Sequence, residues 1–544
     1  MNKVLASLFS YSLIALAMPA VAQQAAPNAG QVLRDLQRAA PDLPPPLAYP
    51  LQLQPLQIPK PSEPVGPQIT LIGITFVGNT VIDSNTLLSA LPGVLGQSMD
   101  LAGLRYLAQR VALYYRANGY PFAHAYLPEQ DVTAGQLRIA LIEGRYGSVK
   151  ANSQSADLAV AAQLYLARLA PGSVIQQSPL ERATLILNEL PGIQVAASIS
   201  PGANPGTGNL DVDVTRTRAY NAYLGVDNHG SRYTGANRLR ADLQLNSPFR
   251  LGDQLNLSAN GNDQQLFFGN LDYSTPRGVD GLRANVGLAR TSYQLGEGFE
   301  GNGGSATVAN VGLSYAWIRQ RTYSLTFNGA FQRKSLLSSF ASGEQTERYH
   351  IDALPMTLRF EHREGLGAGA VTSGSLTSTL AKLQKNEPPL QSNFHKTNLD
   401  LLRLQPMPGN WSLSARMNAQ WANKQLDSSE KFSLGGASSV RAFPNSGAIG
   451  DTGWLAQLEL RYLMGNVMPY VFYDHGLVKS KVDELDDSSQ QSHKLSGAGV
   501  GLRYQDGPWK LDTVLARRIN STGLKDTQTQ TSQHRVWITL GYQF

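Results

Sequence analysis

The sequence has 544 residues, of which 16% are charged and 42% are hydrophobic. Charged residues make up about 25% of ordinary soluble domains, so the chain is neither a highly charged soluble protein nor an acidic disordered one. It contains no cysteine, which excludes a disulfide framework, a thiolate zinc site, an iron–sulfur site and a cysteine nucleophile. The net charge of +6 is too small and too dispersed to indicate nucleic acid as a partner.

The first 22 residues have the pattern of an export signal. Lys3 is followed by a mostly apolar run to Met18, and Ala20-Val21-Ala22 is a cleavage site with small residues at both ends. A membrane anchor is the alternative, but the run is shorter than the roughly 20 residues needed to span a bilayer. Later segments are not apolar over such a length, so any membrane crossing must use strands. We expect an exported chain that begins at Gln23.

A short helix and a proline-rich linker follow the export signal. Within residues 23–40, the pattern predicts a helix over 28–40 with Val32, Leu33 and Leu36 in one apolar stripe. Residues 41–67 contain ten prolines and are expected to form an extended, semirigid spacer. A lone helix of about 12 residues is marginal in water and needs a surface to dock on. The segment is therefore either a disordered N-terminus or a tethered helix that can leave its binding place.

Residues 68–147 and 148–217 have the pattern of two small α/β modules. In the first, a strand over 69–77 precedes a helix that begins after Asp100 and ends at Asn118-Gly119, and strands follow over 121–127 and 136–143. In the second, a helix over 156–169 and a helix that starts with a capping box at Ser178 precede strands near 193–200 and 209–215. A small sheet with an exposed edge can accept an extended peptide as an added strand, although such modules can also be mere spacers.

From residue 218 to residue 544, apolar and polar residues alternate with a period of two. Strands of a soluble sandwich also alternate, but they are usually about five or six residues long. Segments of about ten residues with one apolar and one polar face are typical of a membrane barrel. Sixteen such strands are predicted, with starts near residues 219, 236, 254, 264, 281, 306, 322, 350, 368, 393, 411, 453, 468, 495, 509 and 534.

The even strand number predicts a transmembrane antiparallel β-barrel whose two ends lie on the same side as the modules. Sixteen strands enclose an aqueous lumen rather than a packed core. Such a lumen is wide enough for an unfolded chain, and it would leak unless something filled it.

The longest connection, loop 6 at residues 425–452, separates the eleventh and twelfth strands. By strand parity it starts on the side away from the modules, which would be the cell exterior. It carries Val440 and Phe443 around Arg441, an unusual composition for a loop in solvent. At roughly 3.3 Å per residue, Arg441 can reach deep into the lumen. Its expected partner is Asp474 of the thirteenth strand, because a carboxylate facing lipid is costly. Two ordinary solvated charges are the alternative.

These residues resemble the outer-membrane transporters of two-partner secretion, of the hemolysin-activator and filamentous-hemagglutinin-transporter type. The first module is similar to that family's polypeptide-transport-associated (POTRA) pattern at residues 76–80, 114–120, 127–131 and 142–145. Val440-Arg441-Ala442-Phe443 resembles the sixth-loop motif of valine, arginine, glycine and an aromatic residue. The family's strand motif, phenylalanine-x-aspartate-x-glycine, is matched by Phe472, Asp474 and Gly476. Tyr542 and the terminal Phe544 resemble the aromatic end that the barrel-assembly machinery reads.

The resemblance implies a bacterial outer-membrane protein with both POTRA modules in the periplasm. A secreted partner protein, whose N-terminal secretion domain binds the modules, would thread through the barrel to the surface as a hemolysin, an adhesin or a contact-dependent toxin. The helix of Val32, Leu33 and Leu36 would be the pore plug. The expected partners are this exoprotein, the barrel-assembly machinery and outer-membrane lipid, with no nucleic acid. Ala442 replaces the family's glycine, which disfavours a positive φ at that position.

Known catalytic and energy-coupling motifs are not recognisable in the chain. It has no Gly-x-x-x-x-Gly-Lys-Ser/Thr loop, no Gly-x-Ser-x-Gly elbow and no His-Glu-x-x-His motif. We therefore expect no enzyme, metal or cofactor, and we hypothesise that folding of the client outside the cell drives export. The alternatives are a barrel-assembly factor of the same superfamily, a passive porin and a membrane-barrel enzyme. Two modules with a helix and a proline linker favour secretion over barrel assembly.

Overall fold

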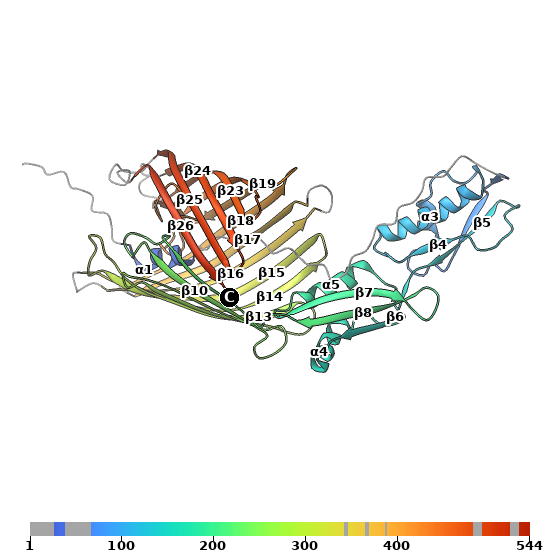
Figure 1. The fold of residues 1–544 in the computed structure, drawn as a ribbon, viewed down its shortest axis with the longest axis horizontal. Coiled ribbons are helices and arrows are strands. Elements are labelled where there is room, and N and C mark those ends of the chain that lie inside the picture. The colour runs from blue at the N-terminus through green and yellow to red at the C-terminus, as the bar shows by residue number, and fades with distance from the viewer. Residues whose placement is uncertain are drawn as a thin grey trace, which may run out of the picture.

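The computed structural model describes residues 27–37, 67–341, 346–364, 369–386, 389–481, 492–522 and 532–544. The expected export signal at 1–22 lies outside these residues, as does almost all of the expected linker at 41–67. Figure 1 shows two small modules in a row next to a barrel, with the N-terminal helix α1 (Ala29–Gln37) inside the barrel. Within the described residues, no helix has both the length and the apolar character needed to span a membrane.

Sixteen antiparallel strands close into one barrel, which confirms the predicted fold. Each strand starts within four residues of its predicted start, and β26 pairs with β9 to close the ring. The barrel strands are β9 (Tyr220–Asp227), β10 (Arg238–Asn246), β11 (Gln254–Asn262), β12 (Phe267–Pro276), β13 (Leu282–Gln294), β14 (Gly303–Arg319), β15 (Tyr323–Ser339), β16 (Thr346–Arg363), β17 (Val371–Asn386), β18 (Pro389–Pro406), β19 (Trp411–Ala422), β22 (Thr452–Tyr462), β23 (Val467–Lys479), β24 (Ser492–Asp506), β25 (Trp509–Thr522) and β26 (His534–Gln543).

The outer surface of the barrel is an apolar belt. Leu239, Val286 and Leu515 are exposed there, while the residues between them face the lumen because neighbouring side chains of a strand point to opposite faces. Aromatic residues gather at the end of the barrel that faces the modules, as in the girdles of membrane barrels. This aromatic belt consists of Tyr315, Trp317, Trp411, Tyr462, Trp509, Tyr542 and Phe544.

The first module has a three-stranded sheet in the order β2-β5-β4, with α3 packed against it. Its elements are β1 (Ile69–Thr70), β2 (Gly73–Val77), α2 (Ser84–Ser89), β3 (Ser98–Met99), α3 (Leu101–Ala117), β4 (His124–Tyr126) and β5 (Gln136–Ile142). Asp100 caps α3 as predicted, since its Oδ1 accepts the Gly103 N–H at 2.8 Å. The strand predicted over 69–77 is divided in two, because β1 leaves β2 to pair with β3 and Leu71 turns into the core between them.

The second module repeats this arrangement with the sheet order β6-β8-β7. Its elements are β6 (Arg145–Asn152), α4 (Ala156–Leu166), α5 (Gln177–Asn188), β7 (Ile193–Pro201) and β8 (Thr207–Arg216). The strand β6, which the sequence did not predict, starts three residues before the expected module boundary. The capping box predicted at Ser178 is wrong. The helix α5 begins at Gln177 after Gln176, which makes no side-chain cap. Pro179 still fits, because N–H groups in a first turn have no partner within the helix.

The helix α5 fastens the second module to the rim of the barrel. The Arg182 guanidinium donates to the carbonyl oxygens of Asp280 and Trp317 at 2.8 and 2.9 Å. Farther along the helix, Glu189 forms an ion pair of 2.8 Å with Arg319. The Gln177 N–H donates to the carbonyl oxygen of Gly119, which connects the two modules. These contacts hold the modules at one end of the lumen.

Candidate functional site in the barrel lumen

The connection between β19 and β22 folds back into the lumen instead of extending away from the barrel. It contains a short hairpin of β20 (Phe432–Leu434) and β21 (Ala448–Gly450). Val440, Ala442 and Phe443 are fully buried in a cluster that includes residues of β22 to β26. The loop segment that the sequence predicted to enter the lumen therefore packs against the inner wall of the last five strands.

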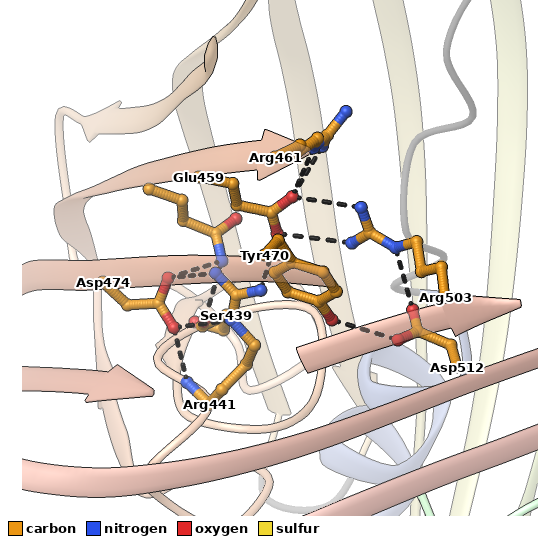
Figure 2. Close-up of polar contacts among 9 residues, drawn as sticks. Ser439, Arg441, Glu459, Arg461, Tyr470, Asp474, Arg503 and Asp512 are labelled. Carbon is orange, nitrogen blue, oxygen red and sulfur yellow. Dashed lines mark hydrogen bonds and ion pairs between the residues drawn. The ribbon is translucent and has the colours of Figure 1, made fainter. Parts of the chain in front are cut away.

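The structure brings Arg441 and Asp474 together (Figure 2). The Arg441 Nε and Nη2 atoms donate to the two carboxylate oxygens of Asp474 at 2.8 and 2.7 Å, and the backbone N–H of Arg441 adds a third bond at 3.0 Å. Asp474 is 0% exposed and Arg441 is 3% exposed. A bidentate pair of this kind fixes both distance and orientation, so it holds the tip of the loop at one place on β23.

The other two residues of the strand motif also contact the loop. The Phe472 ring lies 3.6 Å from the guanidinium carbon of Arg441, a cation–π arrangement. A side chain at Gly476 would lie 2.6 Å from a methyl carbon of Leu434 and 2.9 Å from the carbonyl oxygen of Trp454. Phe472 thus stacks on the loop, Asp474 pairs with it, and Gly476 leaves space for it.

Ala442 fits the loop without backbone strain, because it is absent from the non-glycine residues with positive φ among those described. Its methyl group lies against β24, where a Cβ added to Gly497 would be 2.6 Å from the Ala442 Cβ. The carbonyl oxygen of Ala442 accepts a bond from Arg518 at 3.3 Å, and that of Arg441 accepts one from the Trp537 indole at 2.8 Å. Replacement of the family's glycine by alanine at 442 is therefore accommodated by the missing side chain at 497.

This contact predicts a compensating pair of substitutions. Gly497→Ala should displace the loop tip and reduce, at least severalfold, the export that the family resemblance implies, because two methyl carbons would compete for one space. Ala442→Gly alone should have little effect, and the double variant Gly497→Ala with Ala442→Gly should restore export. Release of a client protein into the medium measures each step. A double variant no better than Gly497→Ala would show that the two residues do not share this space.

A wider network of charges, which the sequence pattern did not predict, surrounds the pair. Glu459 accepts a bond of 2.6 Å from Arg441 Nη1 and also pairs with Arg461 and Arg503 at 2.6 and 3.2 Å. Arg503 in turn pairs with Asp512 at 3.1 Å. One signal was available in the sequence, because these residues occupy polar positions in strands whose apolar and polar residues alternate. Their mutual contacts depend on the register between strands, which the sequence alone does not give.

A second buried charge cluster, which the sequence analysis also missed, holds the start of the loop. The Glu430 carboxylate pairs with Lys334 of β15 at 2.6 Å and with Lys396 of β18 at 2.8 Å. The backbone carbonyl oxygen of Glu430 accepts a hydrogen bond from the Gln420 side chain at 2.9 Å. Glu430 and Lys334 are buried, so the ion pairs are shielded from water. The loop is thus fastened at two separate points, Glu430 and Arg441.

The helix α1 lies between the barrel wall and the loop. Val32 and Leu33 are buried and Leu36 is partly buried, in a cluster with wall residues of β13 to β18. The backbone N–H of Ala29 donates to the Ser338 hydroxyl of β15 at 3.1 Å. The predicted apolar stripe of this helix therefore faces the wall, and its polar side is left for the loop.

The polar side of α1 is bonded to both halves of the loop. Arg34 donates to the carbonyl oxygen of Ser428 at 2.7 Å and to the Ser446 hydroxyl at 2.9 Å, and that hydroxyl bonds to Asp35 at 2.6 Å. At Gly30, a Cβ would lie 2.7 Å from the backbone nitrogen of Ser429, so the helix and loop approach closely there. Beside these contacts the lumen contains a cavity of about 720 Å³.

The two C-terminal aromatic residues lie outside the lumen. Tyr542 packs edge-on against Trp509, with ring centres 4.9 Å apart, and against Phe544 at 4.7 Å. The Phe544 N–H donates to the carbonyl oxygen of Ala222 at 2.9 Å, next to the closing seam of the barrel. Both residues belong to the aromatic belt and have no contact with the loop motif. Among the described residues there is no group of three side chains suited to hold a metal ion.

A family model described as haemolysin secretion/activation protein ShlB/FhaC/HecB matches residues 206–504. The model of the POTRA domain of ShlB type matches residues 69–144. Because the first match covers more than half of the 544 residues, the chain belongs to this family of outer-membrane barrel transporters. Its POTRA modules lie in the periplasm, and the loop side of the barrel faces the exterior.

Several curated proteins and solved structures are similar to the chain. It is 27% identical over 500 residues to the heme/hemopexin transporter protein HuxB of Haemophilus influenzae (strain 86-028NP), which covers 87% of this chain and 86% of that protein. It is 24% identical over 472 residues to the hemolysin transporter protein ShlB of Serratia marcescens, with 82% of each chain covered. The structure of CdiB from Escherichia coli has a TM-score of 0.75 at 20% identity and covers 90% of this chain and 93% of that one. This last likeness supports the fold.

Proposed function

We propose that the chain exports one large partner protein across the outer membrane by two-partner secretion. The observation that carries the proposal is the lumen itself. A wide barrel is filled by a loop and a helix that are held by a few polar contacts, and two POTRA modules are fixed at its periplasmic end. A passive porin needs neither the modules nor such a filling. Membership of the secretion family favours export over barrel assembly.

The modules offer a docking place for an extended client. The strands β2 and β4 are the edges of the first sheet, and β6 and β7 are the edges of the second. Addition of a strand at such an edge uses backbone hydrogen bonds, which tolerate many sequences. A client that arrives unfolded from the inner membrane would bind here before it enters the lumen.

The helix α1 acts in this proposal as a plug that leaves during export. Its nine residues bury only three or four apolar side chains, and its other contacts are a small number of hydrogen bonds to the wall and the loop. An isolated helix of this length is only marginally stable, so its binding place in the lumen and its folding are coupled. The proline-rich segment at 41–67 would tether it to the first module after release.

The client class follows from the relatives by analogy. HuxB is named as a heme/hemopexin transporter and ShlB as a hemolysin transporter, and CdiB is an outer-membrane transporter. We propose a hemolysin, an adhesin or a contact-dependent toxin for this chain, with folding of the client outside the cell as the driving force. The end formed by Tyr542 and Phe544 would be read by the barrel-assembly machinery during insertion.

Co-production with a candidate large exported protein tests the proposal. The client should appear in the medium or on the surface only when the full chain is present. Deletion of residues 69–215 should abolish that release while the barrel still inserts, because the client loses its docking place. Heat-dependent gel migration checks the barrel. Undiminished release from the deleted form would contradict a role for the modules, and no release from the full chain would contradict export of that client.

A further inference from the structure

The outward face of α4 is apolar where a surface helix should be polar. Leu158, Ala162 and Leu166 pack into the core of the second module. On the opposite side, Val160 is 68% exposed and Leu164 is 59% exposed. Exposed apolar residues next to each other on a helix are unusual for a face in water, and these two are adjacent on the helix surface because they are four positions apart. Asp157 is the charged residue of this helix and lies in its first turn. The described part of the chain leaves this face uncovered.

The C-terminal end of α4 is connected to the barrel. Arg168 follows the last residue of α4, Leu166, by two positions, and its guanidinium forms an ion pair of 2.7 Å with Asp280. Asp280 lies in the turn between β12 and β13, at the end of the barrel that faces the modules. Figure 1 shows α4 on the barrel side of the second module. The apolar face thus lies away from the module core, and the end of α4 lies at the barrel rim.

The same rim marks the boundary of the membrane. The Arg182 guanidinium of α5 lies 5.7 Å from the centre of the Tyr315 ring and bonds to the carbonyl oxygen of Trp317. Both aromatic side chains are exposed and belong to the aromatic belt, and such belts lie at the level of the lipid headgroups. Since α4 packs against α5 in one core, α4 lies near that level as well.

We propose that α4 rests on the periplasmic leaflet of the outer membrane, with Val160 and Leu164 in contact with phospholipid. Helices that lie in an interface place apolar residues toward the acyl chains and basic residues beside the phosphates. Arg168 and Arg182 supply the basic groups at the end of α4 and on α5. The contact goes beyond export itself, because it would fix the second module against the membrane whether or not a client is present.

A client protein is the other conceivable occupant of this face. Lipid is favoured because Arg168 and α5 hold α4 at the rim beside the aromatic belt, where the lipid-exposed surface of the barrel ends. A client that passes to the lumen would approach from the inside of the rim. The two occupants are separated by an experiment on the full chain in the absence of any client.

The test uses the absence of cysteine from the chain. Val160→Cys and, separately, Leu164→Cys provide single sites for an environment-sensitive fluorophore such as NBD. Ser198→Cys is the matched control, because Ser198 is exposed on β7 of the same module and points away from its helices. Each labelled full-length protein is reconstituted in vesicles of phosphatidylethanolamine and phosphatidylglycerol, with and without nitroxide-labelled lipid.

The fluorophore at 160 or 164 should emit at shorter wavelength and be quenched by the nitroxide lipid at least twofold more than the fluorophore at 198. Equal and weak quenching at all three sites would overturn the proposal. So would a probe at 160 that is insensitive to lipid but becomes shielded only when the client is added, which would assign the face to the client. Unchanged heat-dependent migration confirms that each variant retains the barrel.

Discussion

Replacement of Arg441 by alanine is expected to reduce export at least tenfold while the barrel still assembles. The substitution leaves the Asp474 carboxylate buried with Gln457 as its remaining side-chain donor at 3.2 Å. Removal of one partner from a buried ion pair costs about 3–5 kcal/mol, which the loop would avoid by leaving its position on β23. Release of the client and the amount of inserted barrel are measured together.

Two further variants make this result specific. Asp474→Ala should resemble Arg441→Ala, because either change removes the same pair. Arg333→Ala is the matched control, since Arg333 forms a similar 2.7 Å pair with Asp352 but is exposed at the barrel surface, where such pairs contribute about 0–1 kcal/mol. Unchanged export in Arg441→Ala would remove this residue from the mechanism. Loss of the barrel from the membrane would assign it a structural role instead.

Substitution of Glu430 by glutamine is expected to open the pore. Neutral glutamine cannot balance the two ammonium groups of Lys334 and Lys396, so this anchor of the loop weakens by about 3 kcal/mol. Ser428 and Ser429 precede Glu430 directly and form the surface on which α1 rests. Weakening of this contact surface should raise the equilibrium constant for release of the helix by about 100-fold. Ion conductance in planar bilayers and sensitivity of cells to large antibiotics would both rise.

The comparison for this prediction is Glu347→Gln. Glu347 also pairs with a lysine, Lys385, at the exterior end of two neighbouring strands, but it is partly exposed and makes no ion pair with the loop. The Glu347→Gln substitution should leave ion conductance unchanged. A Glu430→Gln protein that is as closed as the unmodified chain would show that this cluster does not hold the helix in place. A variant that is closed and has lost export would indicate a role confined to the loop.

The barrel was predictable because each of its strands meets two different surroundings. Lipid on one side and water on the other impose a period of two that is visible in segments such as Trp411–Trp421, independent of any distant contact. The short strand β6 escaped prediction because it is part of a small module sheet with a much weaker pattern. The predicted start of α5 is too late because proline is favoured at the first position of a helix, whereas Pro179 is the third residue of α5.

The charge clusters of the lumen show where single-sequence reasoning ends. A family motif and the cost of a carboxylate in lipid together predict the pair of Arg441 and Asp474. Glu430 has no such motif, and its partners Lys334 and Lys396 come from strands β15 and β18. Their meeting depends on the path of the loop across the lumen, which is a property of the folded barrel.

The strand β14 connects two regions that the export cycle must coordinate. Near its start, Ala306 and Val308 pack against the α1 helix, and near its end Trp317 is bonded to α5 of the second module. These two points are about 35 Å apart along one hydrogen-bonded strand. In the proposed export cycle, tension applied to the module by an arriving polypeptide would pass through the register shift between Ala316 and Ile318 and along β14 to the wall that contacts α1. The arrival of a client at the periplasmic side could thus be communicated across the membrane through β14 alone.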